Sequence, residues 1–371
     1  MPIQDTNKQE PQAVMLDPAA DLGIGKNIIA KIAPHVIGVV GRDFPADTAL
    51  PAFTPPSQSR FGQGVAHYGI MIPDLPAPHH FMANMTIIGY TGFRAWDVDF
   101  ALRGRHRDTA TVGHGTAATT HDPFSIHGRD DTEFAPGGSM LRFGPDYIIS
   151  GTYPSFRLQS ARPGFETDLE ITATGDVTWF TKRPYYTHLA LLSRYRGTLT
   201  HNGHRTEVSG LCSFEYGKGH FPTMILDKPL PAKLKAPFDF FTYHVLNLDE
   251  STQLLLVGTG IGSDVPLALF ATECTANSGP QRIGHSVRFE VTRFQGEPII
   301  GPDGESMAMP AAFTWTIRDG NRVVSTINGT VDTQWLYAGV NSIAGYVYTA
   351  DHKGRTITGR GYIEYSDRRP R

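Results

Sequence analysis

Residues 210–216 read Gly-Leu-Cys-Ser-Phe-Glu-Tyr, and residues 359–365 read Gly-Arg-Gly-Tyr-Ile-Glu-Tyr. When the leading glycines are aligned, Glu215 falls on Glu364 and Tyr216 falls on Tyr365. Each copy is a strand-like run that begins at a glycine and ends on a Glu-Tyr pair. One copy lies past the middle of the chain and the other lies near its end. The repeat therefore predicts two β modules of related design, each ending on an equivalent strand.

The rest of the chain has the pattern of an all-β protein. Short apolar and aromatic runs alternate with Gly, Pro, Asp and Asn turns, which is typical of a sandwich or barrel. Expected strands of the first module include 65–72, 81–90, 94–102, 165–172 and 177–181. A second strand series begins at 238–245, after a linker in which three prolines would interrupt a sheet. These signals divide the chain into a leader and strap (1–58), a first module (59–228) and a second module (236–371).

The leader contains one amphipathic segment, residues 26–33, whose isoleucines recur at helical spacing. We expect it to be a short packing helix. The polar start of the chain shows no secretory signal, and no run approaches the roughly 20 apolar residues that cross a bilayer. These observations predict a cytoplasmic protein without an integral membrane segment.

Composition excludes several classes of partner and cofactor. The formal net charge is −3 over 371 residues, which offers no electrostatic case for nucleic acid or an anionic membrane. The two cysteines, Cys212 and Cys274, are too few for a disulfide framework, so we expect two buried thiols. A homodimer is left open.

Three stretches resemble the tandem-lipocalin family of bacterial carotenoid hydratases (hydroxyneurosporene synthase) and AttH-like proteins, of which kievitone hydratase and fungal Diels–Alderases look like relatives. The family's last strand usually reads Gly-Arg-Gly-Tyr-(Val/Leu)-Glu, as residues 359–364 nearly do. Its second module opens with an aromatic strand, an acidic turn and a Leu-rich strand, here 238–256. Its first module closes with Gly, aromatics and an acidic Glu, here 210–216. This chain departs from the family there, because it lacks the usual Trp and the Asp before Glu215.

The resemblance implies two lipocalin-like antiparallel β-barrels in tandem. It also implies a cofactor-independent enzyme that hydrates, dehydrates, isomerises or cyclises a hydrophobic isoprenoid- or polyketide-like substrate. Such chemistry needs a proton donor, and an apolar pocket can keep a carboxylic acid protonated. Aromatic faces would stabilise a cation. The alternatives are a non-catalytic carrier of lipid or terpenoid ligands, and a structural protein whose barrels are filled by side chains.

Glu215 is the leading candidate for the acid, with His188 and Asp97 as further catalytic candidates. Strand alternation places Glu215 on the face of Leu211 and Ser213, opposite Cys212, Phe214 and Tyr216. For Glu364 a structural role is favoured. The aromatic and histidine candidates for a substrate-binding wall are Trp96, Trp179, Tyr186, Tyr216, Tyr243, His244 and Trp335.

The sequence contains no defensible metal or nucleotide motif. His79-His80 lies in a proline-rich turn without further ligands at zinc spacing, and the histidines and aspartates between 106 and 131 match no metal-binding pattern. Neither a complete phosphate loop nor a Gly-x-Ser-x-Gly elbow is present. We therefore expect neither a metal nor a cofactor.

Overall fold

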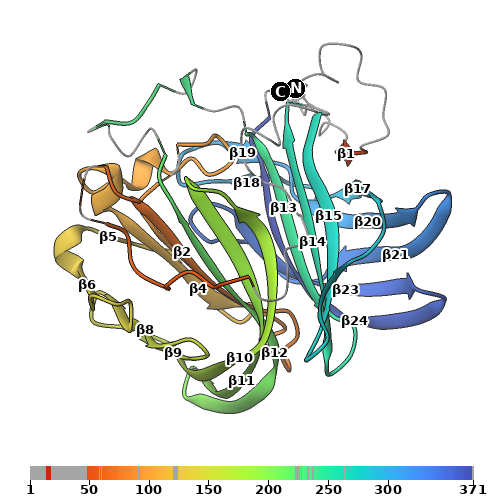
Figure 1. Cartoon of the computed structure of the whole chain (residues 1–371), viewed down its shortest axis with the longest axis horizontal. Helices are drawn as coiled ribbons and strands as arrows, with labels where there is room; N and C mark the ends of the chain where they lie inside the picture. The colour runs from red at the N-terminus through yellow and green to blue at the C-terminus, as the bar shows by residue number, and fades with distance from the viewer. Residues whose placement is uncertain are drawn as a thin grey trace, which may run out of the picture.

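The computed structural model describes residues 14–17 and 48–369, except 58, 60, 91, 120–123, 222–225, 227, 232–233, 236–237 and 263–264. Two large antiparallel sheets stand side by side in Figure 1, each with eleven strands. The predicted all-β fold with two lipocalin-like modules is confirmed. The predicted helix at 26–33 lies outside the described residues.

The first sheet forms the first module. Its strands run in the order β5-β4-β3-β2-β12-β11-β10-β9-β8-β7-β6. Their bounds are β2 (Val65–Ile72), β3 (Met82–Ile88), β4 (Ala110–Thr116), β5 (Phe124–His127), β6 (Thr132–Phe134), β7 (Met140–Phe143), β8 (Tyr147–Thr152), β9 (Ser155–Arg162), β10 (Phe165–Lys182), β11 (Tyr186–His201) and β12 (His204–Gly219). Three short 3₁₀ turns lie between them, η1 (Asp99–Ala101), η2 (His106–Asp108) and η3 (Arg129–Asp131).

The second sheet forms the second module, in the order β1-β17-β20-β21-β23-β24-β13-β14-β15-β16, with β22 beside β23. Its bounds are β1 (Met15–Leu16), β13 (Phe240–Asn247), β14 (Thr252–Ile261), β15 (Val265–Thr275), β16 (Gly279–Arg282), β17 (Ser286–Phe294), β20 (Pro310–Asp319), β21 (Arg322–Val331), β22 (Leu336–Tyr337), β23 (Ser342–His352) and β24 (Arg355–Asp367). A separate two-stranded ribbon joins β18 (Ile299–Ile300) to β19 (Ser306–Met307).

The sequence repeat corresponds to a structural repeat. In each module the closing strand pairs with the opening strand, β12 with β2 and β24 with β13. Glu215 lies opposite Gly69 in the first pair, and Glu364 lies opposite Tyr243 in the second.

Strand alternation sends one face of each closing strand into its own module. Cys212, Phe214 and Tyr216 lie in the core of the first module. Ile363 and Tyr365 lie in the core of the second. The opposite faces meet, because a third buried cluster takes Phe81 and Ala190 from the first module and Tyr243 from the second. The modules therefore share an apolar interface, and both glutamates face it.

Parts of the leader pack on both modules. Val14 and Leu16 join the core of the second module, where β1 pairs with β17. Phe53 packs on the first core, and Thr54 accepts a 2.9 Å hydrogen bond on its backbone oxygen from the Tyr216 hydroxyl. The division at 58/59 stays a prediction.

Three local expectations differ from the structure. Residues 94–102 form a loop and η1 instead of a strand. The strand β4 was not expected, because its Ala-Thr-Val-Gly-His-Gly-Thr sequence is weakly apolar. The expected strands 165–172 and 177–181 are one strand, β10, whose register shifts between Ala173 and Val177. Gly175 has a φ of 98° there, which a glycine adopts without strain.

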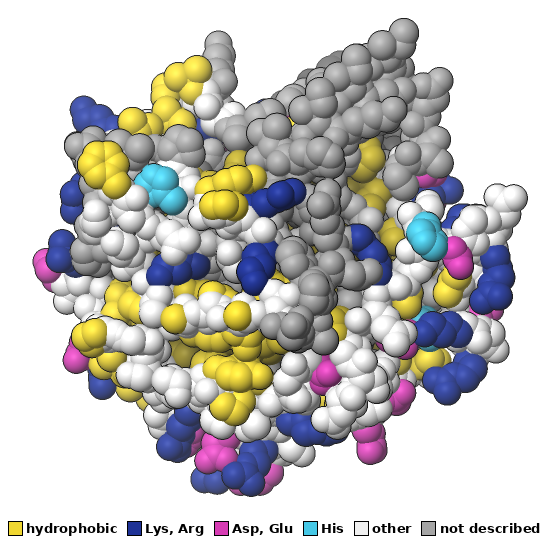
Figure 2. All heavy atoms as spheres, viewed as in Figure 1, with side chains coloured by type: hydrophobic (Ala, Val, Ile, Leu, Met, Phe, Trp, Pro, Cys, Tyr) yellow, Lys and Arg dark blue, Asp and Glu magenta, His cyan; other side chains and the backbone are white. Residues whose placement is uncertain are grey.

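The surface intersperses the two signs of charge, as Figure 2 shows on one face. Exposed pairs such as Arg157–Asp168 at 2.7 Å and Arg196–Glu170 at 2.6 Å bridge neighbouring strands. Among the described residues, no helix has the length and apolar character to cross a bilayer.

Candidate functional site

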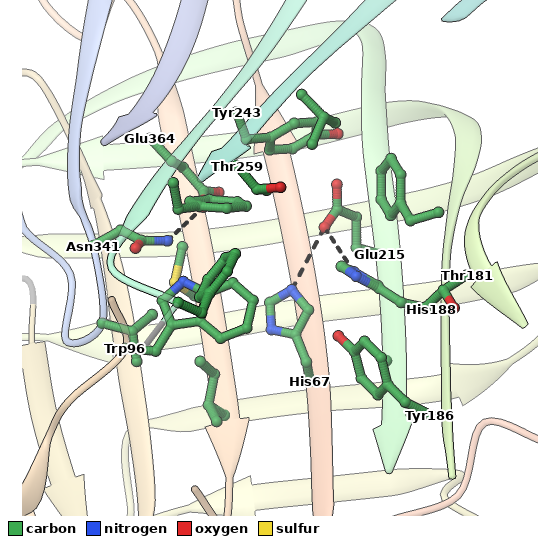
Figure 3. A pocket seen from close by; sticks show the side chains of 18 of the residues that line it. His67, Trp96, Thr181, Tyr186, His188, Glu215, Tyr243, Thr259, Asn341 and Glu364 are labelled. Atoms are coloured by element: carbon green, nitrogen blue, oxygen red, sulfur yellow. Dashed lines mark hydrogen bonds and ion pairs between the residues drawn. The ribbon is translucent and has the colours of Figure 1, made fainter. Parts of the chain in front are cut away.

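A cavity of about 100 Å³ lies between the two modules. Most of its wall is apolar, and Figure 3 shows polar side chains at two places in the wall, one around Glu215 and one around Glu364. The described lining residues are Val65, His67, Met85, Ile87, Trp96, Phe180, Thr181, Tyr186, His188, Glu215, Gly217, Phe238, Phe241, Tyr243, Val257, Thr259, Phe270, Val340, Asn341 and Glu364.

The first polar place is built on three neighbouring strands of the first module. His67 on β2 and His188 on β11 both lie opposite Gly217 on the central strand β12. Glu215 lies two residues before Gly217, on the same face of β12. A Cβ at Gly217 would lie 3.3 Å from the His188 ring, so the missing side chain leaves room for the imidazoles. Register thus places two imidazoles and one carboxylate together.

Glu215 is almost fully buried, and its Oε2 atom faces both histidines. The distance from Oε2 to Nε2 is 3.3 Å for His188 and 3.6 Å for His67. Burial alone would raise the pKa of Glu215, but hydrogen bonding and charge from the two histidines outweigh it and lower the pKa to about 2. Burial lowers the pKa of His188, and its hydrogen bond to Glu215 and the carboxylate charge raise it by less. Glu215 Oε1 and the Tyr243 hydroxyl have no hydrogen-bond partner within normal bonding distance. Burial is the main cause that raises the pKa of Tyr243, and the charge and proximity of Glu215 raise it further.

Glu364 forms the second polar place, on the wall made by the second module. Its Oε1 accepts a 3.0 Å hydrogen bond from the Tyr362 hydroxyl, and its Oε2 accepts a 2.9 Å bond from the Asn341 amide. Burial raises the pKa of Glu364, and the charge of Glu215 raises it further, to about 8. The two donors lower the pKa by less. At neutral pH Glu364 is therefore protonated while Glu215 is ionised.

Aromatic side chains form the rest of the wall. The Phe180 ring lies edge-on to His188 at 4.7 Å between centroids. Trp96 lies on the loop before η1 and packs on Phe238 at 4.8 Å. Ser366 donates a 2.7 Å hydrogen bond to the backbone oxygen of Ala95, so the second module holds this loop of the first.

The structure brings five of the predicted site residues into the cavity wall, which are Glu215, His188, Trp96, Tyr186 and Tyr243. Asp97 lies outside that wall. Its carboxylate, like that of Asp99, pairs with the buried ammonium of Lys235. The predicted strand that would have carried both aspartates is a loop, so we do not keep Asp97 as a candidate.

Four other predicted wall residues lie in the module cores. Trp179 and Tyr216 belong to the first core. Trp335 belongs to the second, where its Nε1 donates to the Pro310 oxygen at 3.1 Å. His244 is fully buried among rings of the second module, with Phe313 at 4.6 Å. Side-chain direction along the strand explains the placement of Trp179, Tyr216 and His244, which point into their own module, whereas Trp335 lies in the loop before β22.

Sequence reasoning missed His67 and Asn341, and favoured a structural role for Glu364. The repeat itself contained the signal for Glu364, since it aligns with Glu215. No local pattern marks His67, which lies 148 residues before Glu215 in the chain.

His67, His188 and Glu215 are, among the residues that the structure describes, the one set of three side chains whose ligand atoms all lie within 4.8 Å of one another. Of the histidines that the sequence singled out, His79 shares a hydrogen bond with the Thr116 hydroxyl, His114 with the Thr167 hydroxyl and His127 with the Ser125 hydroxyl. Residue 121 lies outside the described residues. Cys212 and Cys274 are buried free thiols, as expected.

Comparison with known proteins gives a family and a fold. Residues 85–371 match the family described as a family of unknown function, DUF6670. No protein with a curated description matches the sequence. An AttH-like protein from Nitrosomonas europaea is similar in structure, with a TM-score of 0.56 at 13% identity over 89% of this chain and 99% of that one. Kievitone hydratase from Nectria haematococca has a TM-score of 0.52 at 9% identity over 90% and 97% of the two chains. The fold expected from the resemblance is therefore confirmed.

Proposed function

The chain belongs to the DUF6670 family, and on that premise we propose that it is an enzyme of the hydratase, dehydratase, isomerase or cyclase type. Its substrate would be hydrophobic, because the cavity wall is apolar and aromatic. The observation that carries the proposal is Glu364, a buried carboxylic acid that faces this cavity and is protonated at neutral pH.

A protonated carboxyl in an apolar cavity is suited to proton transfer to carbon. Its pKa of about 8 lies close to neutral pH, where a general acid combines the correct protonation state with a useful driving force. The hydrogen bonds from Tyr362 and Asn341 hold the carboxyl at its place in the wall. Glu364 would therefore be the proton donor, in place of Glu215.

In the hydration direction, the Glu364 proton would bond to one alkene carbon as the π bond breaks. The neighbouring carbon becomes a cation, which aromatic faces such as Trp96 and Phe180 can stabilise. Water positioned by Glu215, His67 and His188 would bond to the cation and lose a proton to solvent. Solvent then returns a proton to Glu364. The reverse sequence is dehydration, and loss of a different proton without water addition is isomerisation.

The size of the cavity limits what enters it. Pockets for whole drug-sized ligands have volumes of about 300–1,000 Å³. A cavity of about 100 Å³ suits the reacting end of a longer apolar molecule. An isoprenoid- or polyketide-like chain has such an end, and the fold shared with a protein described as kievitone hydratase agrees with this choice.

The test uses solvent isotopes, because they report proton transfer to carbon before a product is known. The protein is incubated in D₂O with a panel of apolar alkenes and tertiary alcohols, and deuterium in the recovered compounds is measured by mass spectrometry. We expect incorporation by the wild type. Glu364→Gln should lower the rate by about 100-fold or more, since general acids contribute about 10²–10⁴-fold.

Ligand binding by the same variant separates an enzyme from a carrier. Glu364→Gln keeps the shape of the side chain, so affinity should change little. A non-catalytic carrier of lipids or terpenoids would bind compounds stoichiometrically with no deuterium incorporation in either form. Undiminished incorporation by Glu364→Gln would remove Glu364 from the mechanism.

A further inference from the structure

We propose that His67, His188 and Glu215 bind a divalent metal ion of the zinc type. The inference goes beyond the proposed reaction, because metal binding at these side chains does not depend on which substrate the cavity accepts. It replaces the expectation of a metal-free protein that the sequence motifs suggested.

The spacing of the three side chains carries the first part of the argument. Charge-assisted hydrogen bonds from nitrogen to a carboxylate are about 2.7–2.9 Å long. The distances from Glu215 Oε2 to the two Nε2 atoms, 3.3 and 3.6 Å, are longer than this. Two ligands that each lie about 2.0–2.1 Å from a tetrahedral zinc ion are about 3.3 Å apart. Both distances are therefore longer than strong hydrogen bonds and close to the separation of two ligands on one tetrahedral metal, and all three ligand atoms lie within 4.8 Å of one another.

The burial of the carboxyl group carries the second part. The Glu215 side chain is 3% exposed, and its Oε1 has no hydrogen-bond partner within normal bonding distance. The described residues that line the cavity include neither Lys nor Arg. A buried carboxyl group in an apolar wall needs polar partners or a metal ion to replace the water that it has lost. A divalent cation held by the carboxylate and the two imidazole rings would fill that need.

The ligand set and its position indicate the class of site. Two histidines and one glutamate are a known ligand set of catalytic zinc, which keeps a fourth position for water or substrate. The three side chains come from adjacent strands of one sheet face and point into the cavity, as Figure 3 shows. The fourth position would therefore face the cavity, and water bound there would be a stronger nucleophile than free water.

The surroundings of His67 bear on the strength of binding. Its Nδ1 atom has no hydrogen-bond partner, whereas ligating histidines usually donate this second ring proton to an oxygen. Loss of such a partner costs about 10- to 100-fold in metal affinity. We expect binding weaker by about that factor than in a zinc site with complete outer partners.

Cobalt is the direct probe of this site. The full chain is freed of metal with a chelator, titrated with Co²⁺, and followed by the visible absorption of tetrahedral Co²⁺. Zn²⁺ should then displace the signal, and calorimetry should give one ion per chain. His67→Ala, His188→Ala and Glu215→Gln should each weaken binding more than the about 10- to 100-fold cost of an outer partner.

Glu364→Gln is the matched control, because Glu364 lines the same cavity but lies outside the ligand set. It should bind Co²⁺ within about threefold of the wild type, while it loses the proton-transfer activity proposed above. Circular dichroism on every variant checks that each is folded, and two separate histidine variants guard against one that is not. Absence of tetrahedral Co²⁺ absorption in the wild type, or equal affinity in all ligand variants, would overturn the metal site. Either result would leave the role proposed for Glu364 to its own test.

Discussion

Glu215 and Glu364 occupy equivalent positions of the repeated strand, yet their surroundings give them opposite charge states. Glu215 faces two imidazoles, whereas Glu364 faces a phenol and an amide. Both side chains are buried at the interface between the modules. Titratable pairs whose environments push their pKa values apart are the usual basis of acid and base roles in enzymes. Different neighbours at two equivalent strand positions are thus enough to produce such a pair.

The raised pKa of Glu364 predicts a loss of stability at high pH. The pKa of Glu364 is about 8 in the folded state and its ordinary value is 4.5, so the folded state holds this proton more tightly than the unfolded state does. The contribution is fully present below about pH 4.5 and is lost as the pH rises through about 8. Each pKa unit corresponds to about 1.4 kcal/mol, so the loss is on the order of a few kcal/mol.

Urea unfolding at pH 6 and pH 9 measures this effect. The titratable groups that face Glu364 are Glu215, Tyr243 and Tyr362. The raised pKa of each tyrosine keeps it neutral between pH 6 and pH 9. Glu364→Gln cannot ionise, so its stability should fall less between the two pH values. Equal losses in wild type and variant would assign the pH dependence to other groups.

At the scale of elements, glycines on β2 and β12 make room for the cluster. A Cβ at Gly69 would lie 2.8 Å from Met71 Cε, 3.0 Å from His67 Nε2 and 3.2 Å from Glu215 Cβ. Gly69→Ala should therefore displace the Met71 side chain and the ring of His67 and cost about 1–3 kcal/mol of unfolding free energy, as overpacking does. Chemical denaturation measures the cost, and Co²⁺ affinity should fall in parallel.

The matched control is Gly137→Ala, because a Cβ there meets no atom within 4 Å. Its unfolding free energy should stay within about 0.5 kcal/mol of the wild type. A Gly69→Ala variant as stable as this control would show that β2 can shift without cost.

The loop that carries Trp96 depends on a buried ion cluster. The Lys235 side chain is 3% exposed and pairs with both Asp97 and Asp99. Lys235→Met should cost about 1.5–3 kcal/mol, the range for hydrogen bonds to charged groups. It should also increase acrylamide quenching of tryptophan fluorescence, because Trp96 is partly exposed whereas the other three tryptophans are buried.

Lys353→Ala supplies the comparison for that variant. Lys353 also pairs with a carboxylate, Glu273 at 2.8 Å, but its side chain is 44% exposed. Exposed pairs contribute about 0–1 kcal/mol, so stability and quenching should hardly change. Equal quenching in the two variants would separate the Trp96 loop from the Lys235 cluster.

At the scale of the whole molecule, the shared apolar interface predicts that the two modules unfold together. Phe81 is fully buried in that interface, with its ring 5.9 Å from the ring of Tyr362 in the other module. Phe81→Ala should cost about 3–5 kcal/mol, as loss of a buried phenylalanine does. In variants that keep only Trp179 or only Trp335, the transitions of both modules should move to lower denaturant.

Phe61→Ala is the control, because the side chain of Phe61 is 79% exposed. It should leave both transitions unchanged. Displacement of the Trp179 transition alone by Phe81→Ala would mean that the modules unfold independently.

Local pattern was sufficient for much of the fold. Val65–Ile72 is the strand that its apolar and aromatic run predicted, and the two Glu-Tyr motifs do close the two modules. Alternation along 211–216 also separated Glu215 from Phe214 and Tyr216 correctly, because side chains on a strand alternate regardless of context. The local pattern predicted a strand wrongly at 94–102. There the Lys235 ion cluster and contacts with the second module hold a loop.

The sequence by itself determined two β modules with equivalent closing strands, each with a glutamate on the strand face opposite its tyrosine. Only the tertiary structure decided that these faces meet around one cavity, that His67 joins His188 beside Glu215, and that Tyr216, His244, Trp179 and Trp335 belong to the module cores. The physical reason is that β12 pairs with β11 on one side and with the distant β2 on the other. Pairing between strands far apart in the chain, and packing between modules, leave no local pattern in the sequence.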